Sequence, residues 1–316
     1  MLKHPQITRR RLTQFLRGTL LPAVEGERLS LRIETNPNPV ATAAEAETGP
    51  WKEVTRGYAY GPAYTVHWFR ISGTVPGEWA GRHVAFNAEI GGERTLWKDG
   101  EPWRGIDVEH SDMGLLEGKG FGVEDRVEGG EEINFLIQVY TRNSETTVAG
   151  REKPRSVTTE VVEGAEMFTV DRDLKALAYD FEWAMLLLDE LAETDPGAAG
   201  LLRALNEVCN LWARSGRDAL APARRMIAVA IGNVGGKLAH TIVPVGHAHL
   251  DTAWLWPLAI THLKMAHTTS TQLSLMERYP EYVFVHSQAS QYEWIEKEHP
   301  GLFTRVKQAA ARGQWE

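Results

Sequence analysis

The sequence contains little cysteine and no long apolar run. Cys209 is the single cysteine among 316 residues, so an intrachain disulfide framework is excluded. No stretch approaches the roughly 20 apolar residues that span a bilayer, and the N-terminus lacks the apolar core of a secretory signal. Cys209 itself lies in an apolar helical pattern that is typical of a core residue. These absences predict a cytoplasmic protein with no membrane partner.

The chain also has no excess of positive charge. It carries 34 Lys and Arg residues against 42 Asp and Glu residues, a formal net charge of −8. This balance argues against a nucleic-acid partner, because a protein that tracks phosphates needs clustered cations. One basic cluster, residues 9–11 with Arg17, lies on a short amphipathic stretch. A membrane-surface or transit helix is one interpretation, and a helix packed on its own domain is the favoured one.

The composition is ordinary for a globular protein of two or three domains, with 43% hydrophobic and 24% charged residues. Residues 51–165 contain short β-branched and aromatic runs separated by turn signals, which predicts a β-sandwich. One such signal is Asp99-Gly100, because glycine accepts the positive φ of a hairpin turn. The tryptophans of this region favour a hydrophobic core, and a sugar-stacking platform is the alternative.

The segments on either side of the sandwich have a different pattern. Residues 166–238 repeat apolar side chains three and four apart, which predicts a helical connector. Residues 1–50 are expected to form an N-terminal helix and an extended arm, and residues 239–316 are expected to begin a catalytic β/α domain. The fold class is therefore multidomain α and β.

The most informative segment is VGHAHLDTAWLWP, residues 245–257, which follows directly on the apolar run 241–245. This order predicts a metal site at the end of a buried strand over residues 241–245. Alternate residues of an extended strand point to one face, so His247, His249 and Asp251 are expected on one side. Neighbouring donors with this spacing can converge on one ion with bonds of about 2.0–2.2 Å. Imidazole and carboxylate ligands suit Zn²⁺, with Co²⁺ or Mn²⁺ as alternatives. Buried, hydrogen-bonded histidines and a helix-capping aspartate are the purely structural interpretation.

The motif lies in an alternating strand and helix pattern. A strand, helix, strand unit is nearly always parallel and right-handed, and repeated units build a β/α barrel or an open doubly wound sheet. In either fold, ligands gather at the carboxyl ends of the strands, where the histidine motif and Ser287-Gln288 both fall. Two such units, followed by the start of a third strand, predict a parallel β/α barrel truncated at the C-terminus. After the motif, helices are expected over residues 258–277, 289–298 and 300–312, and strands over residues 282–286 and 314–316.

In this order, the segments closely resemble the N-terminal part of the glycoside hydrolase family 38 α-mannosidases, especially the cytosolic, vacuolar and bacterial branch. The resemblance is sharpest over residues 245–257 and weakens in the helical connector. It continues through LMERYP at residues 275–280 and SQASQYEW at residues 287–294. In the sandwich it rests on WFR at 68–70, WAG at 79–81 and LWKDG at 96–100.

The resemblance implies roles for the motif residues. His249 and Asp251 would be zinc ligands, Trp254 would pack against the mannose in the −1 subsite, and His247 would neighbour the metal. In this family zinc holds vicinal hydroxyls of a terminal mannose, while two carboxyl groups at roughly 5 Å separation carry out retaining hydrolysis. The substrate would be a mannose-containing oligosaccharide, and the family often forms homo-oligomers.

The family's nucleophile, acid/base and remaining zinc ligands would all lie beyond Glu316, so no catalytic residue is assigned. We therefore expect the intact protein to be an α-mannosidase. The chain as given is expected to be inactive and to bind zinc weakly.

Two other functions remain open from the residues alone. An amidohydrolase-type metal barrel also ends its first strand in a His-x-His pair, and it would require both His247 and His249 as ligands. A non-catalytic carbohydrate-binding or assembly fragment is the third interpretation. The paired tryptophans and the long β-rich and helical front end favour the sugar enzyme.

Overall fold

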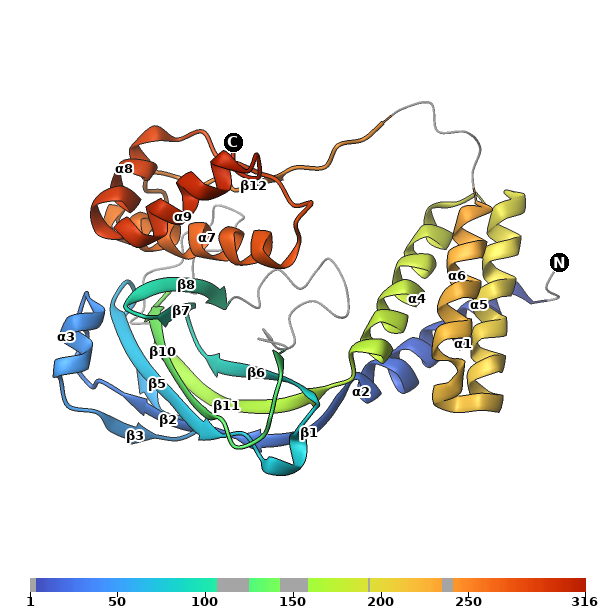
Figure 1. Cartoon of the computed structure of the whole chain (residues 1–316), viewed down its shortest axis with the longest axis horizontal. Coiled ribbons are helices and arrows are strands. Elements are labelled where there is room, and N and C mark those ends of the chain that lie inside the picture. The colour runs from blue at the N-terminus through green and yellow to red at the C-terminus, as the bar shows by residue number, and fades with distance from the viewer. Residues whose placement is uncertain (1–3, 107–124, 143–158, 193, 235–240) are drawn as a thin grey trace.

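The computed structural model describes residues 4–106, 125–142, 159–192, 194–234 and 241–316. Figure 1 shows three parts: a β-sandwich, a bundle of long helices to one side of it, and an α/β unit above the sandwich that contains the C-terminus. Residues 241–245 lead into the α/β unit. The candidate motif lies in this last part, so its surroundings are set by the α/β unit and by the sandwich beneath it.

The sandwich consists of two antiparallel sheets, which confirms the predicted β-sandwich. One has the order β1-β11-β6-β9, with β4 also paired to β11, and the other has the order β3-β2-β5-β10-β7-β8. Alternate side chains of the facing strands fill the space between them, and Phe69, Ile137 and Met167 are fully buried there. The strands are Glu25–Ser30 (β1), Arg32–Thr35 (β2), Lys52–Val54 (β3), Ala59–Tyr60 (β4), Val66–Thr74 (β5), His83–Ile90 (β6), Glu93–Lys98 (β7), Glu101–Ile106 (β8), Asp125–Arg126 (β9), Glu132–Tyr140 (β10) and Glu160–Val170 (β11).

Residues 1–50, expected as a helix and an extended arm, contribute to two parts of the molecule. Strands β1 and β2 each join one of the sandwich sheets, and Nδ2 of Asn36, just after β2, donates to the backbone oxygen of Ala46 in a short helix, α3 (Ala43–Thr48). Thr42 caps α3 in a capping box with Glu45. The first helix instead joins the helical bundle.

Residues 172–232 form helices, as the period of the connector predicts, whereas residues 166–170, expected in the connector, belong to strand β11. The helices of the bundle are Pro5–Phe15 (α1), Leu21–Val24 (α2), Arg172–Glu190 (α4), Pro196–Ser215 (α5) and Leu220–Gly232 (α6), with a π-helical turn at Leu16–Leu20 between α1 and α2. Phe15 of α1 contacts Phe181 edge-on at 5.3 Å between ring centroids, so the basic amphipathic stretch packs on its own domain. Cys209 is buried, as expected, and burial raises the pKa of its thiol to about 11. Among the described residues, no helix is both long and apolar enough to cross a membrane.

The C-terminal unit has the predicted order of strand, helix and strand. Its elements are Gly246–His247 (β12), Leu258–Arg278 (α7), Phe284–Val285 (β13), Ala289–Glu298 (α8) and Pro300–Ala311 (α9). Strand β12 pairs in parallel with β13, and Phe284 forms a parallel bridge to Trp315 on the other side. Three parallel segments therefore lie side by side, although the described residues form no closed barrel.

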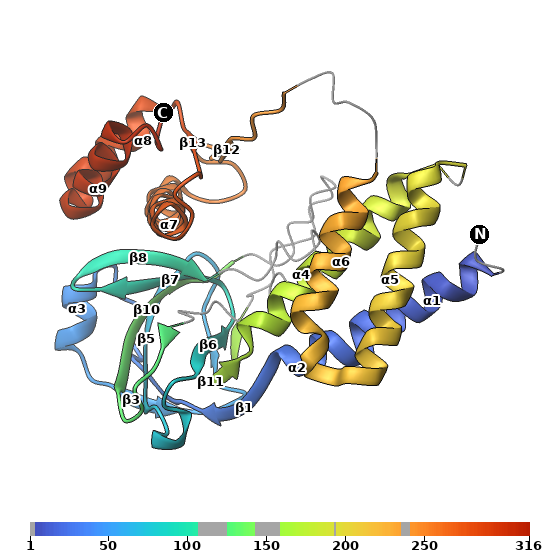
Figure 2. The ribbon, with the colours of Figure 1, turned by 45° about the vertical axis from the view of Figure 1, so that its right-hand side comes forward.

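Helix α7 lies over the β7–β8 hairpin, as both ribbon views show (Figures 1 and 2). The amide of Gly105 donates to Oγ1 of Thr271 at 2.8 Å, and Thr95 Oγ1 lies 3.1 Å from Nδ1 of His267. A Cβ at position 105 would lie 2.3 Å from the His267 ring, so glycine permits this close approach. The sandwich thus supports the α/β unit from below.

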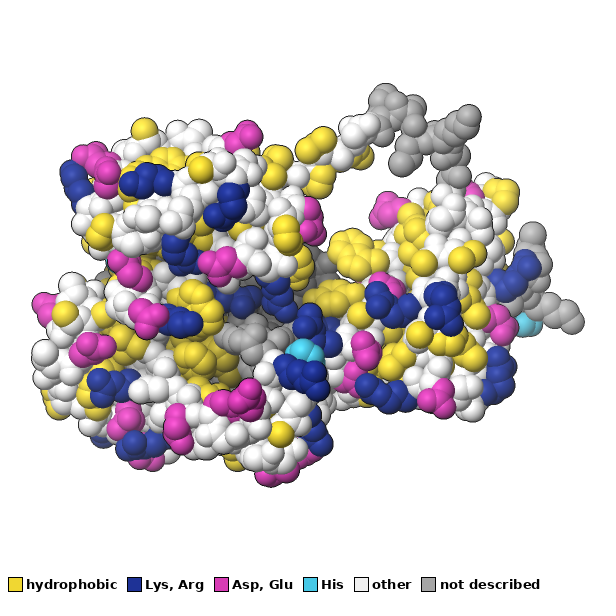
Figure 3. All heavy atoms as spheres, viewed as in Figure 1, with side chains coloured by type: hydrophobic (Ala, Val, Ile, Leu, Met, Phe, Trp, Pro, Cys, Tyr) yellow, Lys and Arg dark blue, Asp and Glu magenta, His cyan; other side chains and the backbone are white. Residues whose placement is uncertain are grey.

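The apolar run 241–245 is not the buried strand that its composition predicts. Only Gly246–His247 is paired, and the side chains of Ile242 and Val243 are 86% and 75% exposed. Figure 3 shows apolar side chains along this exposed segment between the bundle and the α/β unit. A parallel strand is buried only when strands flank it and helices cover it, and the described residues supply a single neighbouring strand here.

A buried histidine makes sandwich stability depend on pH. Burial of His67 in β5 lowers its pKa to about 4, so the neutral ring is favoured in the folded state. Above about pH 6.5 the unfolded ring is also neutral, and no stability depends on it. As the pH falls below about 6.5 the unfolded chain binds the proton first, so stability is lost until the pH reaches the folded pKa. We expect a loss of about 2 kcal/mol between pH 7.5 and pH 5, measured by urea unfolding.

The variant His67→Gln tests this assignment. It should reduce the loss between pH 7.5 and pH 5, because the group that takes up the proton on unfolding is gone. His4→Gln, a change at an exposed histidine, serves as the control. An unchanged pH dependence in His67→Gln would show that other groups produce the loss.

Candidate functional site

The motif occupies the carboxyl end of the parallel strands. His247 ends β12, and residues 248–257 form a loop that leads into α7. His286 follows β13 at the same edge of the small sheet. This is the edge at which ligands bind in parallel α/β folds, so the loop and the residues after β13 form the candidate site.

Within the loop, His249 and Asp251 lie together. Nε2 of His249 is 3.2 Å from Oδ1 of Asp251, and the two side chains are 75% and 38% exposed. His247 is exposed as well, but the described residues contain no group of three His, Cys, Asp or Glu side chains close enough to hold a metal ion. The expected row of three therefore does not form, because regular strand geometry ends at His247. The pair offers one imidazole nitrogen and one carboxylate oxygen to the solvent.

A buried histidine and a buried glutamine hold the first part of the loop. His286 is 4% exposed and Gln291 in α8 is 0% exposed. Nε2 of His286 lies 2.9 Å from Oε1 of Gln291, and Nε2 of Gln291 donates to the backbone oxygen of Leu250 at 3.0 Å. Burial lowers the pKa of His286, and the neighbouring His247 lowers it further, whereas hydrogen bonds to Gln291 and the backbone of Ala248 raise it. The neutral ring is thus the form that the site favours.

A buried threonine of α7 holds the next part. The side chain of Thr261 is 0% exposed, and its Oγ1 donates to the backbone oxygen of Asp251 at 3.2 Å. Oγ1 of Thr261 also accepts from the amide of Ala253 at 3.2 Å and from Nε1 of Trp256 at 2.9 Å. Ala253 has a φ of 61°, which is uncommon for a residue other than glycine and marks a locally strained turn. The backbone around Asp251 is therefore held from within its own α/β unit.

The two tryptophans of the motif have different surroundings. Trp254 is 60% exposed, whereas Trp256 is half-buried and hydrogen-bonded to Thr261. Their rings meet edge-on with centroids 6.1 Å apart. Nζ of Lys264 lies 4.5 Å from the centroid of the Trp256 ring. Trp254 is thus free to contact a ligand, while Trp256 packs in the structure.

Sequence reasoning did not assign His286, Gln291 and Thr261 to the site. The sequence feature that could have identified them is a polar side chain at a position that the strand or helix pattern predicts to be buried. The histidine that ends the run YVFVH is an example. Such residues are recognisable as hydrogen-bonding partners only when the loop above them is known. No partner for them can be deduced from spacing alone, because Gln291 and Leu250 are far apart in the chain.

Two family models match the chain. Residues 239–316 match "Glycosyl hydrolases family 38 N-terminal domain", and residues 27–168 match "Alpha-mannosidase, jelly roll domain". The two matches correspond to the α/β unit with its motif and to the β-sandwich. The resemblance to the N-terminal part of the family 38 α-mannosidases is confirmed.

Curated relatives match over most of the chain. Alpha-mannosidase 2C1 of Homo sapiens is 31% identical over 86% of this chain and 26% of its own length. The alpha-mannosidase of Saccharomyces cerevisiae is 25% identical over 81% of this chain and 24% of its own length. The chain therefore spans about a quarter of the length of these relatives. Among solved structures, β-glucuronidase of Ruminococcus gnavus has a TM-score of 0.28 and 12% identity over 46% of this chain and 28% of that chain, which is too low to support a conclusion.

The buried glutamine provides a test of how the loop is held. Gln291→Leu should lower the free energy of unfolding by about 1–3 kcal/mol, because the Leu250 carbonyl and the buried His286 ring both lose their partner. Urea unfolding at pH 7.5 measures this. Gln6→Leu, on an exposed face of α1, is the matched control and should change stability by less than about 0.5 kcal/mol. Equal effects of the two variants would show that the hydrogen bonds of Gln291 do not stabilise the loop.

Proposed function

The chain carries an α-mannosidase jelly roll domain and a glycosyl hydrolase family 38 N-terminal domain, and we propose that it is the N-terminal part of a zinc-dependent α-mannosidase. The proposed reaction is retaining hydrolysis of terminal α-linked mannose from oligosaccharides. The observation that supports it best is the pair of His249 and Asp251, in the same loop as the exposed Trp254 at the carboxyl end of parallel strands.

The donor pair suits zinc. The separation of 3.2 Å between Nε2 of His249 and Oδ1 of Asp251 is close to the edge of a tetrahedron with metal bonds of about 2.0–2.2 Å. An imidazole nitrogen and a carboxylate oxygen are also ligand types that zinc accepts in catalytic sites. Because a catalytic zinc site has three protein ligands, we propose that further ligands come from outside these residues, and that this chain alone binds zinc weakly.

The residues of this chain would bind and orient the sugar. When bound, zinc would act as a Lewis acid that fixes vicinal hydroxyls of the terminal mannose. The exposed face of Trp254 would cover the apolar face of the same ring in the −1 subsite and exclude water there. The hydrogen bonds to the backbone oxygens of Leu250 and Asp251 would hold the two ligands, His249 and Asp251, in place relative to that ring.

The bond-breaking groups are proposed to lie outside these 316 residues. Retaining hydrolysis needs a nucleophilic carboxylate and an acid/base carboxyl group about 5 Å apart. The α/β unit would then be the start of a β/α barrel whose remaining strands complete the site. A cytoplasmic location and a homo-oligomeric state are parts of the same proposal.

Metal titration separates the proposed ligands from their neighbour. Zinc affinity, measured by calorimetry on the 316-residue chain, should fall at least tenfold in His249→Ala and in Asp251→Ala, because each removes one of two donors. His247→Ala should change the affinity by less than about threefold. A loss of binding in His247→Ala equal to that in His249→Ala would instead support the two-histidine site of an amidohydrolase.

An activity assay tests whether the bond-breaking groups lie outside this chain. The 316-residue chain, supplied with zinc, should release no aryl product from an aryl α-mannoside above the rate of the His249→Ala variant, since the nucleophile is absent. Turnover that disappears in His249→Ala would contradict this and would place a catalytic carboxylate among these residues.

A further inference from the structure

The sandwich contacts the loop that bears the candidate sugar-binding tryptophan. The hydroxyl of Tyr64 donates to the backbone oxygen of Leu255 at 2.5 Å. Leu255 lies between Trp254, which is exposed, and Trp256, which is packed. The two bonded residues are 191 positions apart in the sequence, so this contact exists only because the sandwich and the α/β unit lie against each other.

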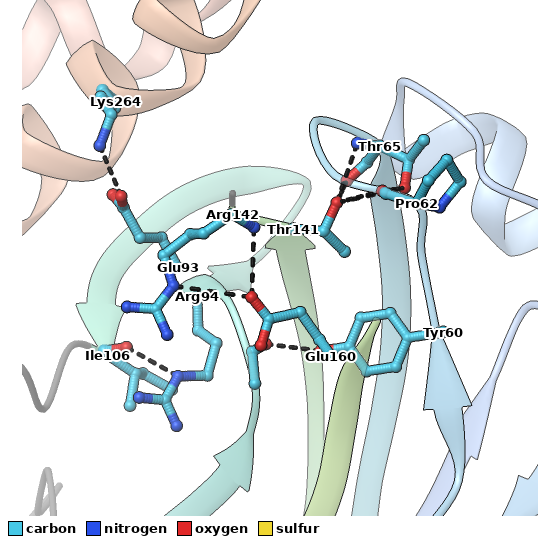
Figure 4. A network of polar contacts seen from close by, with 11 residues as sticks. Tyr60, Pro62, Thr65, Glu93, Arg94, Ile106, Thr141, Arg142, Glu160 and Lys264 are labelled. Atoms are coloured by element: carbon cyan, nitrogen blue, oxygen red, sulfur yellow. Dashed lines mark hydrogen bonds and ion pairs between the residues drawn. The ribbon is translucent and has the colours of Figure 1, made fainter. Parts of the chain in front are cut away.

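The segment that presents Tyr64 is itself held tightly. Oγ1 of Thr65 and Oγ1 of Thr141 both donate to the backbone oxygen of Pro62 at 2.6 Å. The amide of Tyr64 donates to the backbone oxygen of Thr141 at 2.9 Å. Figure 4 shows Pro62, Thr65 and Thr141 gathered in this arrangement at the edge of the sandwich. Strand β10, which ends one residue before Thr141, therefore determines where the Tyr64 side chain begins.

Tyr64 also adopts a strained backbone conformation. Its φ is 66°, in the left-handed region that a bulky aromatic residue rarely enters. Ala253, two residues before Leu255 in the loop, has a φ of 61°. Residues held in this region cost of order 1–3 kcal/mol, and they persist where the surrounding contacts over-determine them, often at functional sites. Tyr64 and the loop that it contacts thus each contain one residue in this region.

A lysine of α7 forms a second connection between the α/β unit and the sandwich. Nζ of Lys264 in α7 donates to Oε1 of Glu93 in β7 at 2.5 Å, and both side chains are less than 20% exposed. The same Nζ lies 5.3 Å from the ring centroid of Tyr140 and 4.5 Å from that of Trp256. Figure 4 shows Lys264 pointing from its helix toward Glu93. The sandwich is therefore linked to Trp256 through the ion pair of Glu93 with Lys264, and to Leu255 through the hydrogen bond of Tyr64.

We propose that Tyr64 is a positioning residue, supplied by the sandwich, that holds the Trp254 loop in the orientation required for sugar binding. Of the loop carbonyls, that of Leu250 is held by Gln291 and that of Asp251 by Thr261, both from the α/β unit. The carbonyl next to Trp254 is held by Tyr64 from the other domain. Because Trp254 is otherwise exposed, the hydroxyl of Tyr64 limits the motion of the ring through its adjacent peptide. The role in sugar binding rests on the proposed function, whereas the restraint on the loop does not.

The structure offers a matched pair of variants. Tyr64→Phe removes the hydroxyl that reaches the loop. Tyr60→Phe removes a hydroxyl that donates to the backbone oxygen of Gly91 at the same distance of 2.5 Å, but within the sandwich. Each variant thus loses one tyrosine-to-carbonyl hydrogen bond, and only the first should affect the motif loop.

Hydrogen exchange of the 316-residue chain measures the restraint. In Tyr64→Phe, the backbone amides of residues 252–256 should exchange about tenfold faster than in the parent, with β5 and β10 unchanged. In Tyr60→Phe those loop amides should exchange as in the parent. Equal exchange of the loop in both variants, or loss of protection throughout the sandwich in Tyr64→Phe, would overturn the proposal.

Sugar binding measures the functional part. With zinc present, the affinity of the chain for methyl α-mannoside, followed by NMR titration, should fall at least threefold in Tyr64→Phe and remain at the parent value in Tyr60→Phe. An unchanged affinity in Tyr64→Phe would overturn the role in sugar binding. A parent chain that binds no mannoside would contradict the proposed function, and the exchange experiment would still decide whether Tyr64 restrains the loop.

Discussion

The loop between β12 and α7 depends on one constraint: backbone carbonyls that turn away from water need donors. Three of its carbonyls receive them from three different elements. Gln291 of α8 donates to Leu250, Thr261 of α7 donates to Asp251, and Tyr64 of the sandwich donates to Leu255. Because the backbone is held in this way, the side chains between these points are free to face the solvent and bind ligands.

Polar contacts also join the sandwich to the α/β unit. Helix α7 contacts the β7–β8 hairpin through hydrogen bonds at Thr95 and Gly105, and through the largely buried pair of Lys264 and Glu93. Removing such a pair from water is costly, so its main contribution is to specify one arrangement of the two parts rather than to add stability. The helical bundle is connected differently, with α2 leading directly into β1 and α4 following directly on β11.

Much of the fold was predictable because it follows from local periodicity. The alternating runs of the sandwich, the three-and-four spacing of the bundle and the strand, helix, strand order near the C-terminus all correspond to observed elements. The prediction of a buried strand over residues 241–245 was wrong, because burial depends on neighbouring strands that periodicity does not reveal. The row of three metal-competent side chains was likewise not observed, since strand geometry ends after His247.

The sequence by itself determined which chemical groups the candidate site offers. The order of residues 245–257 supplies an imidazole, a carboxylate and an indole within six positions, from His249 to Trp254, and no folding event changes that inventory. The tertiary structure decided which of these groups meet and which face the solvent. His286, Gln291, Thr261 and Tyr64 come from distant positions, and their roles depend on hydrogen-bond partners that only the packing of the elements brings within reach. Hydrogen bonds act over about 3 Å, so spacing along the chain carries no information about them until the domains have docked.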